Sequence, residues 1–384
     1  MLLREHQYNR PSSPLRSLRS AMLKVMHVEA GENFYGGARQ VAFLVDGLAR
    51  RGIDNVVVCP QQSLTARRMG ELPAKLHAIP MAGDLDLALP FRLRKLLRAE
   101  KPDLLHLHSR RGPEILGAIA GRLHGLPIVY SRRNDHHESP LITRFKYRLY
   151  DRVVAISAAI GDVLRDSRVP PSKIRVVRSA FHPEPVTPLS RDALRAEFGL
   201  PADAFVIAIV AQLIRRKGHA VLLDAMPRLL KAIPNLHVLF FGKGGLQAEL
   251  EQQIAAAGLH ERVTLAGYRE DLPTLLEGLD LLIHPAFAEG LGVSLLQASA
   301  NGVAIVASNA GGIPEAVRDG VNGVLVPPHD VAALADAILA LAHDDARRRA
   351  LGTAGRRLIA DEFSVDTMVD GNLAVYRELL GGGR

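Results

Sequence analysis

Short apolar runs alternate with amphipathic stretches along most of the chain. In the stretch 37–51, Val41, Leu44, Val45 and Leu48 recur three or four residues apart, which predicts a helix with one apolar face. The apolar runs of the first half are predicted to be strands, and they lie at residues 22–29, 55–60, 76–80, 103–109, 127–131 and 152–157. Strands that alternate with helices favour a parallel, doubly wound sheet, so an α/β fold is expected.

The pattern restarts after a proline-rich segment. Residues 181–190 contain three prolines and are interpreted as a domain linker. Six further strands are predicted, at residues 205–213, 236–242, 262–267, 279–285, 303–308 and 323–328. The 384 residues also suit two domains better than one. We therefore predict two Rossmann-like domains and a last helix, at residues 22–185, 191–363 and 364–380.

The first 21 residues differ from the rest of the chain. They carry four arginines and no continuous apolar run, so they do not resemble a signal peptide. They are expected to be a disordered extension, with Met22 as an alternative start. No stretch reaches the roughly 18–20 apolar residues of a membrane span. A single cysteine, Cys59, excludes an internal disulfide and favours a reducing compartment, so a cytoplasmic protein is expected.

The charge of the two halves has opposite sign. Residues 1–190 hold 30 Lys and Arg against 17 Asp and Glu, whereas residues 191–384 hold 18 against 23. The basic half is predicted to meet an anionic leaflet or a phosphorylated glycolipid, peripherally on the inner face of the cytoplasmic membrane. Two basic amphipathic stretches, 90–101 and 141–152, suit this role. In the second stretch, Arg144, Arg148 and Arg152 recur every fourth residue, so they are expected on one helix face. A solvated basic surface is the alternative. Nucleic acid is disfavoured, because zinc-finger spacing and an aromatic-rich signature are absent.

The stretch 284–302 carries the clearest chemistry. A predicted strand ends at His284, an acid and two glycines follow, and a helix begins near Val293. Gly290 and Gly292 allow the backbone to approach a ligand, and the N–H groups at the helix start suit a diphosphate. Glu289 would be repelled by phosphate, so it is better placed to accept hydrogen bonds from sugar hydroxyls. The alternative is an acidic helix start after a glycine turn.

Two other turns follow predicted strands of the second half. Arg215, Arg216 and Lys217 lie after residues 205–213, at the strand end where open α/β sheets bind ligands. Cations there can neutralise a leaving diphosphate. Gly311 and Gly312 again allow close backbone approach, with Glu315 near the start of the next short helix.

Six motifs in order give a resemblance that spans roughly residues 22–380. They are GGARQVAFLVDGLARRG (36–52), PDLLHLHS (102–109), VAQLIRRKGH (210–219), FGKGG (241–245), the acid–glycine stretch 289–297 and GGIPE (311–315). With these motifs the chain resembles the retaining family 4 glycosyltransferases of GT-B fold, including those that build bacterial lipopolysaccharide and the cell envelope. The resemblance implies two Rossmann-like domains that face a central cleft.

The resemblance also implies roles for particular residues. Glu289 would bind hydroxyls of the donor sugar, Arg216 and Lys217 would hold the diphosphate, and Tyr268 would lie near the base. The terminal helix would cross back onto the first domain. The remaining donor-binding positions would be Gly36, Gly37, Gly242, Gly290, Leu291, Gly292 and Gln297.

The chain departs from the family pattern at three positions. The second acid of the family's Glu-x7-Glu pair is Gln297 here, which can bind ribose hydroxyls only without charge assistance. Gln212 stands where many members have Arg, and Arg216 is expected to compensate. Arg133 stands where many members have His; it cannot act as a base, but it can hold donor hydroxyls or an acceptor phosphate. His136 is either an acceptor contact or an ordinary loop residue.

Two further patterns concern metals. Asp84 and Asp86 form an acid-x-acid pair, but Gly83 favours a turn over a metal site. His106 and His108 are alternate residues of a predicted strand, so they are expected on opposite faces, with His108 reaching the cleft as a catalytic candidate. Because no zinc spacing is present, no metal and no cofactor are expected besides the nucleotide-sugar co-substrate.

The resemblance implies transfer of a sugar from a nucleotide-diphosphate donor with retention. Because the first half is basic, a lipopolysaccharide core or a lipid-linked saccharide is the expected acceptor. The cations and the helix-end amides would stabilise the leaving group. A nucleotide-sugar epimerase and a non-catalytic sugar-nucleotide-binding protein are the alternatives. A nicotinamide dehydrogenase is disfavoured, because the first loop lacks G-x-G-x-x-G and the second strand ends without an acid.

Overall fold

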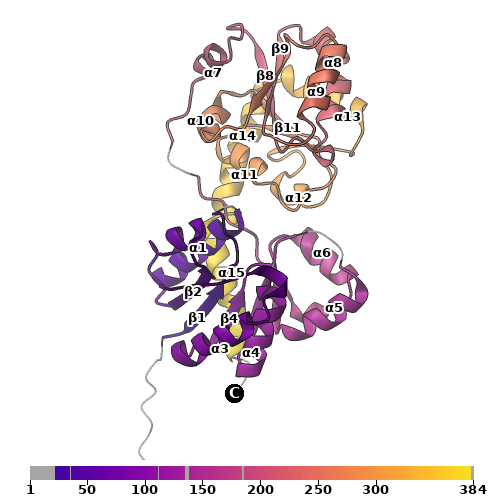
Figure 1. The fold of residues 1–384 in the computed structure, drawn as a ribbon. Helices are drawn as coiled ribbons and strands as arrows, with labels where there is room; N and C mark the ends of the chain where they lie inside the picture. The colour runs from indigo at the N-terminus through magenta and orange to yellow at the C-terminus, as the bar shows by residue number, and fades with distance from the viewer. Residues whose placement is uncertain (1–21, 35, 111, 135–137, 184–185, 382–384) are drawn as a thin grey trace, which may run out of the picture.

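The computed structural model describes residues 22–34, 36–110, 112–134, 138–183 and 186–381. The predicted N-terminal extension and His136 lie outside these residues. The described chain forms two α/β units, one above the other in Figure 1, each with its own parallel sheet. The predicted GT-B arrangement of two Rossmann-like domains is confirmed.

The sheet of the first domain has seven strands in the order β3-β2-β1-β4-β5-β6-β7. They are β1 (Lys24–Val28), β2 (Asp54–Pro60), β3 (Lys75–Ile79), β4 (Leu104–Leu107), β5 (Ile128–Arg132), β6 (Arg152–Ala155) and β7 (Ile174–Val176). The central strands are buried throughout, as expected for a sheet covered on both faces. The strand order reverses between β1 and β4, so the loops after these two strands border the same crevice.

Helices cover both faces of this sheet (Figure 1). They are α1 (Gly36–Arg50), α2 (Leu64–Met69), α3 (Leu89–Glu100), α4 (Ala118–His124), α5 (Pro140–Lys146) and α6 (Ala158–Asp166). Short 3-10 turns lie at Gly83–Leu85, Tyr147–Leu149 and Pro171–Lys173, and a π-helical turn at Pro113–Gly117 precedes α4.

The second domain repeats this plan with six strands in the order β10-β9-β8-β11-β12-β13. They are β8 (Phe205–Val210), β9 (Leu236–Phe241), β10 (Val263–Gly267), β11 (Leu281–His284), β12 (Ile305–Ser308) and β13 (Gly323–Val326). The order reverses between β8 and β11, so the loops after these strands meet. Its helices are α7 (Arg191–Glu197), α8 (His219–Ala232), α9 (Gln247–Ala256), α10 (Leu272–Leu275), α11 (Val293–Ala300), α12 (Ile313–Ala316), α13 (Val331–Ala342) and α14 (Asp345–Glu362).

The last helix, α15 (Val365–Gly381), packs on the first domain although it follows the second (Figure 1). Val369 of α15 touches α1 at Gly47, where any larger side chain would collide with it. Arg51 of α1 pairs with Asp366 and Asp370 of α15. The chain thus crosses between the domains twice.

One predicted helix is shorter than expected. The stretch 141–152 was predicted to place Arg144, Arg148 and Arg152 on one helical face. Instead, α5 ends at Lys146 and a 3-10 turn follows. Arg152 lies in β6 and pairs with Glu378 of α15, so the prediction is wrong for Arg152. Apolar side chains such as Tyr147 and Tyr150 enter the core and end the helical repeat.

Candidate functional site

The loop after β11 holds the central carboxylate. It runs from Pro285 to Gly292, and α11 begins at Val293. Gly292 has a φ of 81°, a left-handed conformation that turns the chain into the helix and that glycine adopts without penalty. The first N–H groups of α11 have no carbonyl within the helix, so the loop ends in free donors. The predicted glycine turn and helix start therefore exist at this position.

Glu289 lies in this loop as a half-buried, charged group, with a side chain that is 14% exposed. Its Oε2 accepts a hydrogen bond from His284 Nε2 at 3.2 Å and forms an ion pair with Lys217. Burial by itself raises the pKa of Glu289, but the His284 hydrogen bond and the Lys217 charge outweigh it and lower the pKa to about 2. Burial also lowers the pKa of His284, so this histidine is neutral at neutral pH. Glu289 is thus a permanent hydrogen-bond acceptor.

The cationic turn after β8 packs directly on the same loop. Arg215–Lys217 form a 3-10 turn, and Gly218 follows with a φ of 74°. A side chain at Gly218 would overlap the carbonyl of Pro285, so only glycine allows this contact. Arg216 Nη1 donates to the Ala288 carbonyl at 2.9 Å, and the Arg216 carbonyl accepts from Phe287 N at 3.0 Å. The turn that carries Arg216 and Lys217 is therefore packed directly against the loop that carries Glu289.

The paired glycines before α12 have a structural partner that the sequence did not indicate. Gly312 N donates to the Glu289 carbonyl at 2.8 Å. A Cβ at Gly311 would overlap the Glu289 carbonyl, and one at Gly312 would overlap that of Gly290. The two glycines thus allow close approach to the Glu289 loop itself. Three loops, after β8, β11 and β12, form one packed site.

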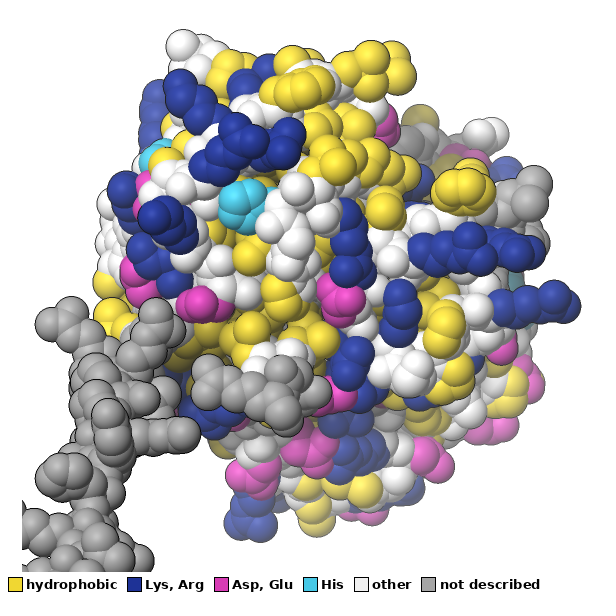
Figure 2. Space-filling model, turned by 90° about the horizontal axis from the view of Figure 1, so that it is seen from below, with side chains coloured by type: hydrophobic (Ala, Val, Ile, Leu, Met, Phe, Trp, Pro, Cys, Tyr) yellow, Lys and Arg dark blue, Asp and Glu magenta, His cyan; other side chains and the backbone are white. Residues whose placement is uncertain are grey.

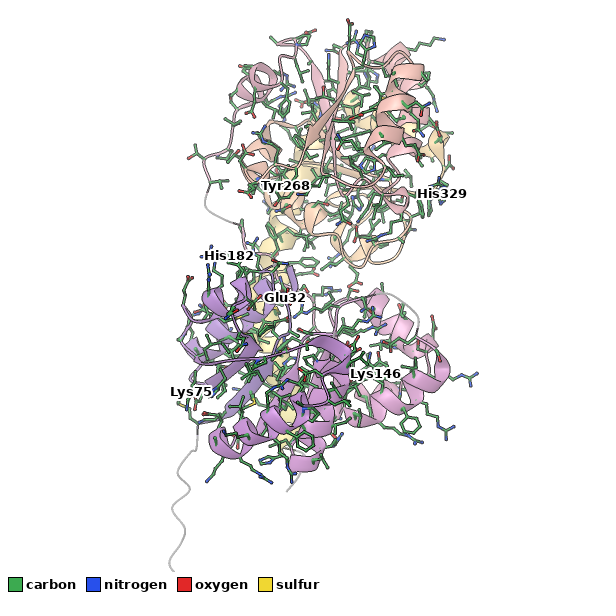
Figure 3. The ribbon with its side chains drawn as sticks, viewed as in Figure 1. Glu32, Lys75, Lys146, His182, Tyr268 and His329 are labelled. Atoms are coloured by element: carbon green, nitrogen blue, oxygen red, sulfur yellow. The ribbon has the colours of Figure 1, made fainter. Side chains whose placement is uncertain are left out.

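The other donor-side positions border these loops. Gly242, with a φ of 144°, packs against the Ala211 carbonyl next to Gln212, so its lack of a side chain serves packing. Tyr268 follows β10 and is 62% exposed, with Lys243 Nζ 5.1 Å from its ring centre (Figure 3). Gln297 lies half-buried in α11, and Leu291 is buried.

The first domain contributes the loops after β1, β4 and β5. Glu32, in the loop after β1, lies where this domain faces the second (Figure 3). Gly36 and Gly37 begin α1, and the Arg133 side chain passes 3.8 Å from the Cβ position of Gly37. Burial lowers the pKa of Arg133, and the charge of Glu29 opposes that effect.

Glu29, at the carboxyl end of β1, is a candidate site residue that the sequence reasoning missed. It follows β1, is 5% exposed and accepts hydrogen bonds from Ser109 and from Gly31 N. An acid immediately after a central parallel strand was the available signal, since ligands bind at that end of such sheets.

Comparisons with known proteins agree with this arrangement. Residues 34–184 match the model of Glycosyltransferase Family 4, and residues 190–358 match Glycosyl transferases group 1. The D-inositol 3-phosphate glycosyltransferase 1 of Catenulispora acidiphila is 33% identical over 309 residues, which are 73% of this chain and 73% of that protein. The chain belongs to glycosyltransferase family 4.

Two further relatives cover more of the chain. The lipopolysaccharide core biosynthesis glycosyltransferase LpsE of Rhizobium meliloti is 28% identical over 355 residues, 91% of this chain and 98% of LpsE. The crystal structure of HepE from Anabaena with UDP has a TM-score of 0.80 at 22% identity and covers 93% of this chain and all of HepE. HepE also has a structure with UDP-glucose. This chain is thus a glycosyltransferase, not a dehydrogenase.

In this glycosyltransferase, His106 and His108 lie on the same side, which contradicts the prediction of opposite faces. Their ring centres are 3.8 Å apart, and both are buried with His27. β4 ends at Leu107, so His108 lies beyond the strand, where the alternation of side chains no longer holds. His108 is 3% exposed and does not reach solvent as a catalytic group would.

The three histidines are also the one candidate metal set found among the described residues, with ring nitrogens within 4.8 Å of one another. Hydrogen bonds already occupy most of these nitrogens. His106 bonds to Tyr376 at 2.5 Å and to Ser131 at 2.8 Å, and His27 bonds to Asn55 and His108. Burial lowers the pKa of all three, so they are neutral. The cluster therefore ties α15 to the sheet.

Two other sequence candidates have structural roles. Cys59 is buried in β2, and burial raises the pKa of its thiol to about 12, so the thiol is protonated at neutral pH. Asp84 and Asp86 lie at a 3-10 turn, as predicted. Asp84 accepts from Gly112 N, and Asp86 pairs with Arg92.

Glu315 connects the donor-side loops to the first domain. Its Oε1 accepts a hydrogen bond from Ala159 N in the first turn of α6 at 2.9 Å, and its Oε2 pairs with Arg178 at 3.3 Å. Both partners belong to the first domain. Because Gly312, three residues earlier, is bonded to the Glu289 loop, the interdomain contact and the donor carboxylate share one short segment.

We expect Glu315→Ala to lower kcat by about tenfold, because a charge-assisted hydrogen bond and an ion pair between the domains are lost. Glu315→Gln keeps an acceptor for Ala159 N and should lose less. Steady-state kinetics with varied donor would separate kcat from the KM for donor. Glu362→Ala is the matched control, since Glu362 pairs with Arg318 and reaches Arg178 only at 3.8 Å. Equal losses in both variants would show that Glu315 has no special role.

Proposed function

We propose that this glycosyltransferase moves a sugar from a nucleotide-diphosphate donor to a cell-envelope saccharide, either the lipopolysaccharide core or a lipid-linked saccharide, with retention. The observation that carries the proposal is the pair of Glu289 and Lys217 at the meeting point of β8 and β11. The carboxylate of Glu289 lies beside the cations of Arg216 and Lys217. A carboxylate suits the hydroxyls of a sugar, and the cations suit the diphosphate to which that sugar is joined.

The cations suit the departing diphosphate. When the bond between the anomeric carbon and the phosphate oxygen breaks, negative charge grows on the diphosphate. Arg216 and Lys217, with the first N–H groups of α11, supply positive charge on the side where that charge develops. Because Lys217 pairs with Glu289 in the free protein, the diphosphate competes with a carboxylate for this ammonium group.

Glu289 suits the sugar. With a pKa of about 2 it is charged at neutral pH, so it accepts hydrogen bonds from two hydroxyls without taking a proton. In a single-step reaction with retention, the acceptor hydroxyl attacks from the face that the diphosphate leaves, and an oxygen of the leaving phosphate is then a candidate base. Arg133, beside Gly37 on the opposite domain, is positioned to contact donor hydroxyls or an acceptor phosphate.

We further propose that transfer needs no metal ion. Arg216 and Lys217 supply the positive charge that a divalent cation supplies in other sugar transferases. The two acids of the acid-x-acid pair, Asp84 and Asp86, are occupied by Gly112 N and Arg92. Activity in excess chelator should equal activity without it.

A donor panel followed by a product assay tests the function. UDP-, GDP- and ADP-sugars are compared by thermal shift, since a ligand of the folded state raises the melting temperature. The stabilising donor is then incubated with and without a saccharide acceptor, and the anomeric configuration of the product is read by NMR. Acceptor-dependent release of nucleoside diphosphate is expected. Conversion of the donor without acceptor would indicate an epimerase, and binding without turnover a non-catalytic protein.

The end of the first domain away from the second is proposed to rest on an anionic leaflet. Figure 2 views this end, where Lys and Arg side chains lie among exposed hydrophobic ones. Phe91 of α3 and Phe145 of α5 are 74% and 77% exposed. Basic amphipathic surfaces of this kind bind headgroups through buried apolar side chains and electrostatic attraction. Among the described residues, none of the helices is long and apolar enough to cross a bilayer.

Liposome co-sedimentation checks this contact. Binding should rise with the fraction of anionic lipid and fall with salt, because exposed charges are screened over about 8 Å at physiological ionic strength. Replacing Arg94, Lys95 and Arg98 of α3 by Gln should remove most binding. A control variant loses three exposed cations of the second domain, Lys231, Arg347 and Arg357. Absence of binding to anionic vesicles at low salt would contradict the membrane contact and would favour a soluble acceptor.

A further inference from the structure

A cavity of about 420 Å³ opens on the first domain between α5 and the segment that follows α6. Four cationic side chains line it, from Arg144, Arg148, Arg168 and Lys173, and no carboxylate is among its lining residues. The buried Val169 is also among its lining residues. The cavity therefore combines apolar and cationic lining residues.

Three of these cations have no acidic partner among the described residues. Within the part of the chain that the structure describes, no acid lies within ion-pair distance of Arg144, Arg148 or Arg168. Other arginines of this domain are paired, such as Arg122 with Asp151 and Arg175 with Glu378. Like charges gathered around a concave surface create a strong positive potential, which attracts an anion.

Lys173 is fixed by the backbone. Its Nζ donates to the carbonyls of Tyr147 and Tyr150, at 2.9 and 2.6 Å. The ammonium group thus holds the turn after α5 against the segment after α6, and so shapes the cavity between them. The three arginines remain free to turn toward a ligand.

Arg168 has a backbone conformation that favours glycine. Its φ is 61°, and it stands just past the end of α6. Arg168 N donates to the Arg165 carbonyl, and Val169 N donates to that of Leu164, which together form a Schellman motif. Glycine is the usual residue at this position, since an L side chain there is strained. An arginine at a strained position that also lines a cationic cavity suggests a function for its side chain.

The cavity is separate from the donor site. The start of α6 touches the second domain through Ala159 and Glu315, and the cavity lies past the other end of this nine-residue helix. At 1.5 Å per residue the helix places it about 13 Å from the interdomain contact. An anion bound here is not the diphosphate of the donor.

We propose that this cavity binds a phosphate group, with the guanidinium groups of Arg144, Arg148 and Arg168 donating to its oxygens. Planar guanidinium groups match phosphate geometry and are always charged, which favours phosphate over a neutral saccharide. The phosphate belongs either to a lipid headgroup or to a soluble phosphorylated molecule. A lipid headgroup as the source of the phosphate depends on the membrane contact proposed above, whereas the phosphate site itself does not.

The test compares two variants that remove the same charge. Arg168→Gly removes one guanidinium and relieves the strained backbone, so the melting temperature should stay or rise while phosphate binding falls. Arg67→Ala removes an exposed cation of α2 that does not line the cavity. Affinity for glycerol 3-phosphate is measured by calorimetry at low ionic strength. We expect a loss of about tenfold or more in Arg168→Gly and little change in Arg67→Ala.

A vesicle arm separates the two sources of phosphate. Vesicles that contain phosphatidic acid are compared with phosphatidylserine vesicles of equal surface charge. A preference for phosphatidic acid that disappears in Arg168→Gly supports a lipid headgroup. A loss confined to glycerol 3-phosphate supports a soluble phosphate and overturns the lipid source.

Two results would overturn the site itself. One is an equal loss of affinity for glycerol 3-phosphate in both variants. It would show that the loss comes from the overall charge of the protein and not from this cavity. The other is the absence of saturable phosphate binding in the unaltered protein. Transfer to a soluble acceptor is measured in parallel and should be unchanged in Arg168→Gly. A protein that binds phosphate here but transfers no sugar would contradict the proposed function and would still support the phosphate site.

Discussion

Glu289→Ala should lower sugar transfer by about a thousandfold while the protein stays folded. The carboxylate is the acceptor proposed for donor hydroxyls, and each hydrogen bond to a charged group contributes about 1.5–3 kcal/mol. Two such bonds lost from the transition state account for this magnitude. Turnover is measured as nucleoside diphosphate released in the presence of acceptor, and folding is checked by the thermal unfolding curve.

Glu289→Gln distinguishes the sugar contact from the ion pair. The amide of Gln has nearly the same size as the carboxylate of Glu289. It cannot form the ion pair with Lys217 that is present in the unliganded protein, so Lys217 becomes available to the ligand. We therefore expect Glu289→Gln to transfer poorly and yet to bind nucleoside diphosphate more tightly than the unaltered enzyme. Near-normal turnover in either variant would remove Glu289 from the donor site. Weaker binding of the diphosphate in Glu289→Gln would show that the Lys217 pair does not compete with the ligand.

The pH dependence of Glu289 follows from its lowered pKa. A carboxyl whose pKa falls from about 4.5 when unfolded to about 2 when folded stabilises the protein above pH 4.5, and this contribution is lost as the pH falls toward 2. Glu289 is therefore ionised throughout the neutral pH range. An acidic limb of the rate profile above pH 4.5 must come from another group.

The strands and the order of the motifs were predictable because both depend on local sequence. The run 76–80 differs by one residue from β3, and the cationic turn and Glu289 fall just after β8 and β11. In a doubly wound sheet, the strands at the reversal of order carry the ligand site at their carboxyl ends. The convergence of these two loops thus followed from topology.

The contacts between distant segments were not predictable in the same way. Gly311 and Gly312 fit a ligand-binding loop as well as a packing contact, and only the tertiary structure shows that they meet the backbone of Glu289 and Gly290. The alternation rule failed for His108 because β4 ends one residue earlier. Arg152 fitted a helical repeat in sequence, but β6 and the pairing with Glu378 place it in the sheet. For the two glycines and for Arg152, a partner more than twenty residues away decided the outcome.

Replacing Arg216 and Lys217 together by Ala should weaken binding of the nucleoside diphosphate by about a hundredfold, and binding of the free nucleoside far less. The two cations follow β8 within one turn, and Arg216 is anchored to the Ala288 carbonyl beside Glu289. A charge-assisted contact to phosphate is worth about 1.5–3 kcal/mol, and a nucleoside without phosphate cannot make it. Calorimetric titration with both ligands measures the difference.

Arg215→Ala is the control for this pair, because Arg215 belongs to the same turn and carries the same charge. Arg216 and Lys217 contact the Glu289 loop through their side chains, whereas no such contact of Arg215 is found among the described residues. Arg215→Ala should leave both affinities within about twofold of the unaltered enzyme, as expected for an exposed charge that makes no direct contact. Loss of Lys217 also removes one of the two partners of Glu289, so Lys217→Ala alone should raise the pKa of that carboxyl. Equal losses for nucleoside and nucleoside diphosphate in the double variant would mean that the pair shapes the loop and does not contact phosphate. A selective loss for the diphosphate, absent in Arg215→Ala, would assign the leaving group to this turn.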